Sequence, residues 1–421
     1  MGSQVSWGKS IFEFVSSSCV AAPGPRRWDC AHVDDMRPGA RRIVRGVGCV
    51  ALIGLGMLVG PAPTGNGDPR LLTVVRPPPT ADPAAPGIVI ASADADLPDP
   101  FLLDDGGVYY LYDSTSFGDS TQNVPLRVGQ PGHWSQSVDA VPRLPAWAVG
   151  DPAPDAPTWS PSVYKLGGVF VMYLAPGLRG SQPPQHCIAI GTARDPAGPF
   201  HLRNTPFICQ RDLGGDIDPQ VFVDRHGPDG PSRPNYLVWK SDNNSTPGDG
   251  ATTIWAAPLS NDGFHLTGRP VPIFAPDQSW QRPLVEAPQM VLSPSSAVWM
   301  FFSAGTGFFS PDYGMGAVRC AGPLGPCADP LPGPLITSNA QGAGPGEEMY
   351  FQGPDSSDWL LYSPEHNNVP TYLLRPVEAA RIGWNNNGPF VAAAGAFPLS
   401  YEDLGVVRSS SGSRRAEAGS R

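Results

Sequence analysis

Three acidic residues of this chain lie beside prolines in similar local sequences. Asp99 lies within Pro-Asp-Pro-Phe (98–101), Asp218 within Ile-Asp-Pro (217–219), and Glu286 within Val-Glu-Ala-Pro (285–288). One carboxylate can activate a water molecule while a protonated carboxyl gives its proton to a leaving oxygen. If the chain brings these three groups together, they predict acid–base hydrolysis.

Each of the three acids has a plainer interpretation. Asp99 could cap a turn, Asp216 competes with Asp218 on the same predicted strand face, and Glu286 could pair with Arg282 at the surface. The acids that compete with Asp99 are Asp94, Asp96, Asp104 and Asp105. Asp99 and Asp218 directly precede a proline whereas Glu286 stands two residues before one, so simple strand alternation would turn them to opposite faces. A bulge at one strand entry would restore a common face.

A fivefold repeat of aromatic strands could position these acids. Strands centred on Tyr109, Phe170, Tyr236, Trp299 and Trp359 follow one another at intervals of 61, 66, 63 and 60 residues. Each follows a turn or a polar stretch, as the second strand of a hairpin does. Repeats of this length that hold several strands each are typical of propeller blades.

A second mark precedes each aromatic strand. The acidic segments at 98–101, 217–219 and 285–288 are three examples, Trp-Ser-Pro-Ser-Val (159–163) is another, and Gly-Pro-Gly-Glu-Glu-Met (344–349) is a looser fifth. Proline is tolerated at the start or edge of a strand. Each mark therefore predicts the entry to an innermost strand, and residues 96–405 are predicted to form an all-β, five-bladed β-propeller.

The composition agrees with an all-β chain that has many turns. Of 421 residues, 49 are glycine and 52 are proline, 39 are aromatic, and only 16% are charged. The aromatic content favours a packed core over disorder. The formal net charge of −10 argues against nucleic acid or an anionic membrane surface as a partner and suits a neutral ligand.

The two marks together resemble glycoside hydrolase family 43, whose five-bladed propellers cleave arabinofuranosides and xylosides. The segment Ala-Arg-Asp-Pro-Ala-Gly-Pro-Phe (193–200) also resembles the family's second-blade hairpin. The resemblance implies that Asp99 is the general base, that Asp218 tunes and orients the acid, and that Glu286 is the general acid. Inversion requires a separation of about 6.5–9.5 Å between base and acid, which admits a water molecule.

Further side chains are candidates for sugar binding. Trp159 could stack on a sugar or fill the space between blades, which is the stronger expectation, and Trp147 is a rival platform. Tyr313 and Arg319 of the fourth blade are further candidates. Many family members have a histidine after the Gly-Pro-Gly of blade five, near a central ion or water, whereas this chain has Glu347. We expect no required cofactor and no metal ligand; a structural Ca²⁺ near Glu347 is left open.

These observations predict a secreted, inverting glycosidase that acts on furanosides or pentosides of an oligo- or polysaccharide. The alternatives are a propeller that binds carbohydrate without catalysis and a retaining, fructosidase-like hydrolase. We expect a monomer that contacts a membrane only during export. The sugar, the linkage and endo or exo action are not fixed by the sequence.

The amino-terminal region predicts export. Arginines at positions 37, 41, 42 and 45 precede an apolar run at 47–59, so residues 1–64 resemble a signal region whose true start could be Met36. Residues 65–95 are predicted to be a proline-rich linker, and residues 406–421 a disordered tail. The four cysteines beyond the signal are expected to pair locally, as Cys187–Cys209 and Cys320–Cys327.

Overall fold

The computed structural model describes the propeller region of the chain. The described residues are 87–91, 96–115, 121–149, 158–223, 235–245, 250–308, 310–340, 342–366 and 375–393. The chain divides into two units, 1–74 and 75–421, and every described residue belongs to the second. The predicted signal region, most of the linker and the carboxy-terminal tail lie outside the described residues.

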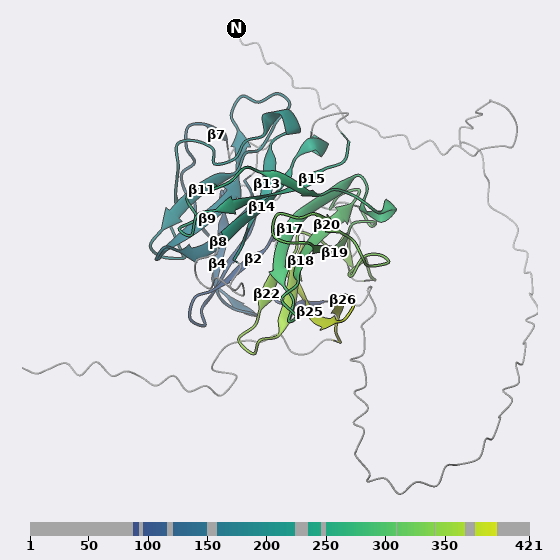
Figure 1. Ribbon diagram of the computed structural model, residues 1–421. Coiled ribbons are helices and arrows are strands. Elements are labelled where there is room, and N and C mark those ends of the chain that lie inside the picture. Colours follow the sequence, from purple (N-terminus) through teal and green to yellow (C-terminus); the bar gives the residue numbers. More distant parts are fainter. Residues whose placement is uncertain are drawn as a thin grey trace, which may run out of the picture. The chain divides into compact units, whose positions relative to one another are not determined.

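The described region is built from five small antiparallel sheets, which confirms the predicted all-β, five-bladed propeller (Figure 1). Blade one contains β2 (Phe101–Asp104), β3 (Tyr109–Tyr112), β4 (Pro125–Gln130), β5 (His133–Trp134) and β6 (Val138–Asp139). Blade two contains β8 (Trp159–Leu166), β9 (Val169–Ala175), β11 (Ala189–Ala193) and β12 (His201–Leu202).

Blades three and four have the same four-stranded order and lie side by side in the ribbon view (Figure 1). Blade three contains β13 (Asp216–Phe222), β14 (Asn235–Ser241), β15 (Thr253–Leu259) and β16 (Val271–Phe274). Blade four contains β17 (Leu284–Leu292), β18 (Val298–Gly305), β19 (Gly314–Cys320) and β20 (Cys327–Ala328). The predicted aromatic strands β3, β9, β14 and β18 are the second strands of their blades.

Blade five is made from both ends of the described chain. Strands β22 (Met349–Gln352), β23 (Asp358–Tyr362), β25 (Glu378–Asn385) and β26 (Gly388–Val391) come from the carboxy-terminal part. Strand β1 (Ile88–Val89) pairs antiparallel with β25 on the outer side. Ile88 and Val89 lie in the predicted linker, but their backbone groups complete the fifth sheet.

Short elements connect the blades. Two-stranded pairs are formed by β7 (Ala148–Val149) with β10 (Gly177–Leu178) and by β21 (Gly342–Ala343) with β24 (Glu365–His366). Single-turn 3-10 helices occur at Arg211–Leu213, Asn243–Ser245 and Ser279–Gln281. No helix among the described residues has the length and apolar character needed to cross a membrane.

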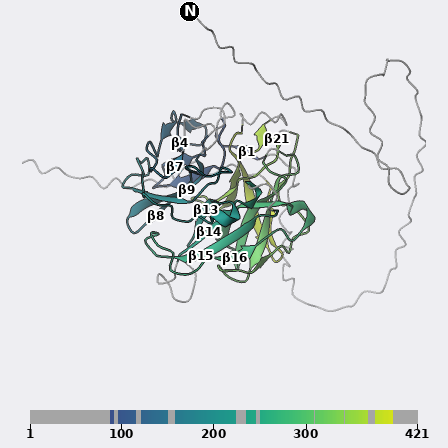
Figure 2. The same cartoon turned by 90° about the horizontal axis from the view of Figure 1, so that it is seen from above.

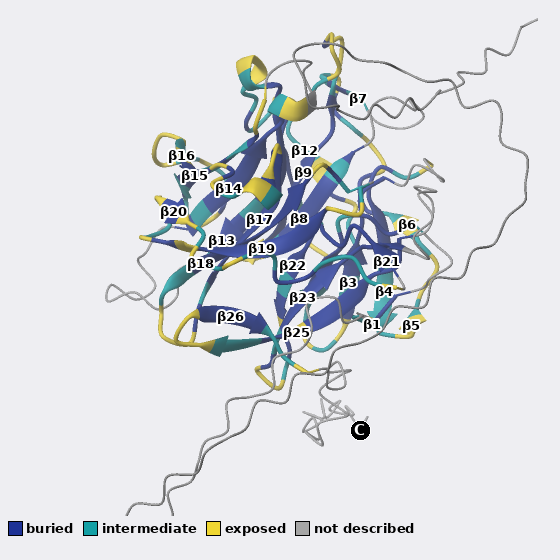
Figure 3. Ribbon diagram, turned by 90° about the vertical axis from the view of Figure 1, so that its right-hand side faces the viewer, coloured by how far each residue is buried: buried dark blue, intermediate teal, exposed yellow. Residues whose placement is uncertain are grey.

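The innermost strands close a ring around one axis. Strand β2 packs beside β8, β8 beside β13, β13 beside β17, β17 beside β22, and β22 beside β2. The view from above shows the sheets gathered around this centre (Figure 2). Most residues of the inner and second strands are buried, and the exposed residues concentrate on turns and outer edges (Figure 3). The core therefore lies between neighbouring blades, as the aromatic contacts of Phe101 with Tyr164 and of Phe301 with Trp384 illustrate.

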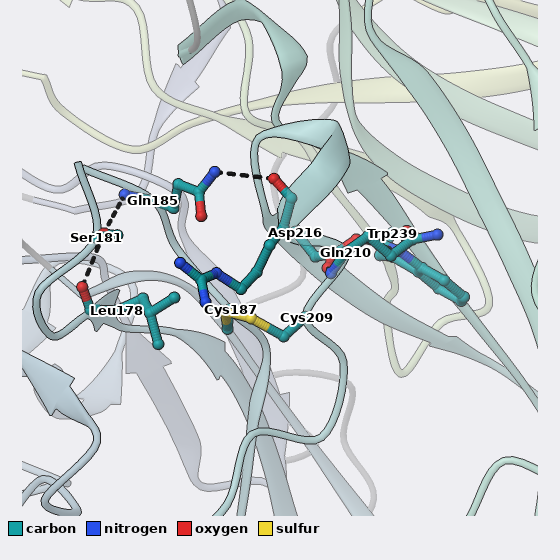
Figure 4. The surroundings of a disulfide bond; sticks show 9 residues. Leu178, Ser181, Gln185, Cys187, Cys209, Gln210, Asp216 and Trp239 are labelled. Atoms are coloured by element: carbon teal, nitrogen blue, oxygen red, sulfur yellow. Dashed lines mark hydrogen bonds between the residues drawn. A yellow bond between two sulfur atoms is a disulfide. The ribbon is translucent and has the colours of Figure 1, made fainter. Parts of the chain in front are cut away.

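Both predicted disulfides are present. Cys320 and Cys327 join β19 to β20 at the outer edge of blade four, where their backbones are paired. Cys187 and Cys209 close a loop between blades two and three, with a Cα–Cα distance of 4.8 Å (Figure 4). On the blade-three side of this bridge, Trp239 donates its indole N–H to Asp216 at 3.0 Å.

Candidate active site

The three predicted acids line one cavity at the propeller axis. Asp99, Asp218 and Glu286 border a cavity of about 360 Å³. Its further lining includes Ser114, Trp159, Lys240, Phe308, Glu347 and Arg375. A cavity of this size lies within the range typical of small-ligand sites. The structure therefore brings together carboxyls from blades one, three and four that are up to 187 residues apart in the sequence.

A repeated backbone feature aims these side chains into the cavity. The residue before the proline has a left-handed conformation in four blades: φ is 51° at Asp99, 50° at Ser160, 56° at Asp218 and 49° at Ala287. Ladder register shifts accompany it in β8, β13 and β17. Each left-handed residue interrupts strand alternation, so two consecutive side chains can face the axis.

This feature resolves the register problem of Glu286. Ala287, not Glu286, is the structural equivalent of Asp218, because both have the left-handed conformation. The equivalent of Glu286 in blade three is Ile217, and both line the cavity. The expectation of a bulge at one strand entry understated the repetition, since the same irregularity occurs in three ladders.

Glu286 has a cation on one carboxyl oxygen and a phenol on the other. Lys240 Nζ lies 2.8 Å from Oε2, and the Tyr313 hydroxyl lies 2.7 Å from Oε1. Lys240 is only 1% exposed and also contacts Asp242 at 3.2 Å, so its charge is shared between two carboxyls. The alternative pairing of Arg282 with Glu286 is not observed, although the structure describes both residues. Arg282 donates to the backbone oxygen of Pro276, and Glu286 contacts Lys240.

Asp218 lies between blades two and four and is hydrogen-bonded by both. The Ser160 hydroxyl donates to Oδ1 at 2.6 Å, and the backbone N–H of Ala287 donates to Oδ2 at 2.9 Å. Burial raises the pKa of Asp218 to about 7 against the opposing charge of Lys240, and negative charge on Glu286 raises it further. The competing acid, Asp216, is held by Gln210 and Trp239 and does not line the cavity.

Asp99 accepts a hydrogen bond from a neutral hydroxyl group. The Ser114 hydroxyl donates to Oδ2 of Asp99, and the same oxygen of Ser114 accepts the backbone N–H of Ser160 at 2.7 Å. Burial raises the pKa of Asp99, while the positive charge of Arg375 and hydrogen bonds from Ser114 and Glu347 oppose that rise. Arg375 does not contact Asp99 as an ion pair, because it is bound to Asp96 at 2.8 Å.

The other acids near Asp99 have structural partners. Asp104 accepts the backbone N–H of Gly107 at 2.6 Å, and Asp105 pairs with Lys165 at the surface. Asp96 holds Arg375. Asp94 lies outside the described residues. Among the described acids of this segment, Asp99 is thus the one that faces the cavity.

The match to known proteins agrees with this geometry. Residues 92–390 match the model of glycosyl hydrolases family 43. The chain belongs to glycosyl hydrolase family 43. This assignment covers all five blades, including the segments that hold Asp99, Asp218 and Glu286.

Relatives of this family-43 chain have related activities. It is 27% identical over 146 residues to the extracellular exo-alpha-(1->5)-L-arabinofuranosidase ArbA of Cellvibrio japonicus, a match that covers 33% of this chain and 41% of that protein. The chain therefore matches less than half of the length of this relative.

Solved structures share the fold at lower identity. A thermostable family-43 glycoside hydrolase superposes with a TM-score of 0.60 at 22% identity, over 73% of this chain and 97% of that one. The alpha-L-arabinofuranosidase of Lactobacillus brevis gives 0.55 at 17% identity, over 74% and 98%. The endo-arabinase of Bacteroides thetaiotaomicron gives 0.54 at 17% identity, over 72% and 99%.

Of the four predicted sugar-binding residues, two lie at or beside the cavity of the family-43 site and two lie away from it. Trp159 lines the cavity and stacks on His186, with ring centroids 3.8 Å apart. Tyr313 is buried against Glu286. Trp147 donates its indole N–H to the backbone oxygen of Arg203 and packs on the core of blades one and two, whereas Arg319 is exposed on β19 opposite Ala328. Neither Trp147 nor Arg319 lines the cavity, because both belong to peripheral segments.

The stacked pair of Trp159 and His186 is adjacent to the Cys187–Cys209 disulfide through His186. His186, on which Trp159 stacks, directly precedes Cys187, and its backbone oxygen accepts the N–H of Asp216 at 3.0 Å. Figure 4 shows the surroundings of the disulfide, where Ser181 links Leu178 to Gln185. The disulfide thus fixes the segment that supports one wall of the family-43 site.

Several residues of the site were missed from the sequence. Lys240, Ser114, Phe308 and Arg375 line the cavity, although none belongs to the repeated marks. Lys240 lies near the end of β14, directly after Trp239, and a lysine in a buried strand is an unusual placement that could have signalled a buried partner. Arg375 and Phe308 lie in blade connections that carry no comparable signal.

A metal site is not supported by the donor groups of the family-43 cavity. Among the described residues, no group of three or more His, Cys, Asp or Glu side chains is arranged to hold an ion. Glu347, the candidate for attracting Ca²⁺, instead lies 2.9 Å from the Tyr313 hydroxyl. The residues present do not fit the ion that the resemblance suggested.

Proposed function

We propose that this protein is a secreted, inverting glycoside hydrolase that acts on arabinofuranosides or related pentosides. One observation carries the proposal: Asp99 and Glu286, from different blades, border a single cavity together with Asp218. Family membership supports glycoside hydrolysis, and the names of the relatives favour arabinofuranosides and arabinan.

In the proposed reaction Asp99 takes a proton from water while Glu286 protonates the departing glycosidic oxygen. The water attacks the anomeric carbon from the face opposite the leaving group, which inverts its configuration. Asp218 adds negative charge near Glu286 and favours its protonated form. Trp159 and Phe308 offer ring faces beside the sugar, which suits apolar sugar surfaces.

The reaction as proposed needs no cofactor, since the carboxyls supply both proton transfers. Removal of metal ions by a chelator should leave the rate unchanged. The substrate is a neutral oligo- or polysaccharide, and we propose that the protein acts as a monomer outside the cytoplasm. The extracellular location of the arabinofuranosidase relative supports this location.

The test is a panel of 4-nitrophenyl pentosides and fructosides, followed by proton NMR of the first sugar formed. We expect turnover of an arabinofuranoside or xyloside with inverted configuration. A retained configuration would replace the proposal by the nucleophilic, fructosidase-like mechanism. Binding of arabinan oligosaccharides without turnover would replace it by the binding-protein alternative. Asp105→Asn, a surface change in the same blade as Asp99, serves as the control and should behave like the wild type.

A further inference from the structure

A fourth carboxyl lies at the axis of the propeller. Glu347 belongs to the blade-five mark, lines the cavity, and has the same left-handed conformation as Asp99 and Asp218, with φ of 56°. A glutamate in this conformation is strained, and such residues cluster at functional sites. Blade five therefore presents a carboxyl at the place equivalent to the catalytic acids of blades one and three.

The surroundings fix Glu347 against Tyr313. A Cβ at the preceding Gly346 would lie 2.0 Å from Cε1 of Tyr313, so only glycine lets the backbone pass over the ring. The backbone N–H of Glu347 donates to Ser303 Oγ at 2.9 Å. The position of the Glu347 carboxyl is thus set by the fold.

Glu347 connects the two catalytic carboxyls. Its Oε1 lies 2.9 Å from the Tyr313 hydroxyl, which lies 2.7 Å from Oε1 of Glu286. On its other side the Glu347 carboxyl faces Asp99, with which it lines both the main cavity and a second one of about 20 Å³. Three contacts therefore run in a chain: Asp99 to Glu347, Glu347 to Tyr313, and Tyr313 to Glu286.

Counting the protons available to these contacts favours a protonated Glu347. A tyrosine hydroxyl has one proton to donate, and an ionised carboxylate has none. If all three carboxyls were ionised, only one of the three contacts could be a hydrogen bond, and Asp99 and Glu347 would meet as like charges. A proton on Glu347 makes the contact with Asp99 a hydrogen bond and leaves the Tyr313 proton for a second one.

The charges around these four side chains also favour a neutral Glu347. The two cations that face them are Arg375 and Lys240, which are already paired with Asp96 and with Glu286 and Asp242. The facing acids are Asp218, Glu286, Glu348 and Asp113. No cation contacts Glu347 among the described residues, and burial together with the charges of Glu286 and Asp99 raises its pKa well above the ordinary value.

We propose that Glu347 is a positioning residue for the base: a neutral carboxylic acid that donates a hydrogen bond to ionised Asp99. With Ser114 it gives the base two neutral donors, which stabilise the charged form and leave its full charge for the attacking water. Glu347 thereby sets the lower pH limit of activity. This proposal rests on the proposed function of Asp99.

Two substitutions of Glu347 distinguish a neutral Glu347 that donates a hydrogen bond from an ionised Glu347. Glutamine resembles a protonated carboxyl, so Glu347→Gln should leave the acid limb of the kcat/KM profile where the wild type has it. Glu347→Leu removes the donor and should move that limb up by about one pH unit, a tenfold loss below it. If Glu347 were an anion, both variants would remove negative charge beside Asp99 and move the limb to lower pH, which would overturn the proposal.

An infrared measurement tests the proton itself and needs no turnover. The difference spectrum between wild type and Glu347→Gln at neutral pH should contain the carbonyl stretch of a protonated carboxyl. A carboxylate band in its place would refute the proposal, even if the leucine variant does not fold. If the wild type lacks glycosidase activity, the proposed function fails while this spectrum still decides the state of Glu347.

Calcium titration addresses the remaining role for this carboxyl. Calorimetry with CaCl₂ should give no heat of binding to the wild-type protein. Binding that is lost in Glu347→Gln would show that Glu347 acts as an anionic metal ligand, and the neutral-donor proposal would fall.

Discussion

The two sides of the cavity stabilise their carboxyls by different means. On the side of blades three and four, Glu286 touches a buried cation, Lys240, at 2.8 Å. On the side of blades one and five, Asp99 is held by Ser114 and Glu347, while Arg375 stays bound to Asp96. A base in direct contact with a cation would lose affinity for the proton of water, whereas neutral donors orient it with its charge free.

The acid side combines opposite charges for a related reason. On this side a buried cation contacts the carboxyl that is proposed to donate a proton. Asp242 shares the charge of Lys240, and Asp218 adds negative charge nearby. The difference between the sides thus matches the proposed roles, in which Asp99 takes a proton from water and Glu286 gives one to the leaving oxygen.

The largest difference should appear when each catalytic carboxyl becomes an amide. Asp99→Asn should lower the rate about 10²–10⁴-fold on every substrate, because no group remains to activate water. Glu286→Gln should cost a similar factor on natural glycosides but much less on nitrophenyl glycosides, whose leaving groups need little protonation. Steady-state kinetics on both substrate types measure this, and equal losses for Glu286→Gln on the two types would exclude it as the acid.

Removing the cation on each side should shift opposite limbs of the pH profile. Lys240→Met should move the alkaline limb, which reports the acid, to higher pH. Arg375→Met should move the acid limb to higher pH, because Arg375 lowers the pKa of Asp99. The pH dependence of kcat/KM distinguishes the two variants. A shift of the same limb in both would contradict the assignment of Lys240 to the acid side and Arg375 to the base side of the cavity.

Both cation variants should also be less stable. Each leaves a buried carboxylate without its partner, which typically costs about 3–5 kcal/mol. Denaturant unfolding measures the loss, and Lys165→Met, which breaks an exposed pair with Asp105, is the control that should change little.

Asp218→Asn should move the alkaline limb to lower pH, the opposite direction to Lys240→Met. The reason is that a negative charge near the acid is lost. The asparagine can still accept from Ser160, so the geometry should persist. A profile in which the limb stays in place, with only kcat reduced, would reassign Asp218 from tuning the acid to orienting groups.

A further expected effect is a decline of stability with rising pH. Burial raises the pKa of Asp218 to about 7 and that of Glu348 to about 8, whereas the unfolded chain ionises near the ordinary values of about 4. The folded state thus binds more protons, and the stability these groups provide at pH 4 is lost between about pH 4 and 8. Each group contributes at most about 1.4 kcal/mol per pH unit.

Thermal unfolding across this pH range gives the measurement. Glu348→Gln should flatten the decline, because glutamine does not titrate. Asp105→Asn should leave the slope unchanged, since that carboxyl is at the surface. A stability that rises from pH 4 to 8 would show that Asp218 and Glu348 are ionised in the folded protein.

The sequence predicts the blades well because their signals are local. Aromatic strands such as Tyr109–Tyr112 and the prolines beside Asp99 and Asp218 follow from strand and turn chemistry within a few residues. The resemblance to family 43 then pointed to three acids, which the structure places on one cavity.

The missed features depend on contacts distant in sequence. The pairing of Lys240 with Glu286 spans 46 residues and that of Arg375 with Asp96 spans 279. The left-handed conformation of Ala287 is equally hidden, because alanine has no preference for it. Trp147 was considered for its aromatic ring alone, which does not distinguish a sugar platform from core packing.

Strand β1 has a consequence for how the ring assembles. Gly87 donates its backbone N–H to the carboxylate of Glu378, 291 residues later, and β1 then pairs with β25. Contacts of such separation form late, because a long loop must close before they can stabilise anything. The amino-terminal strand must therefore wait until blade five has been synthesised. Proteolytic trimming that removes β1 would leave only the Glu378–Ala379 end of β25 unpaired and open to association with other chains, because β26 still pairs with the rest of that edge.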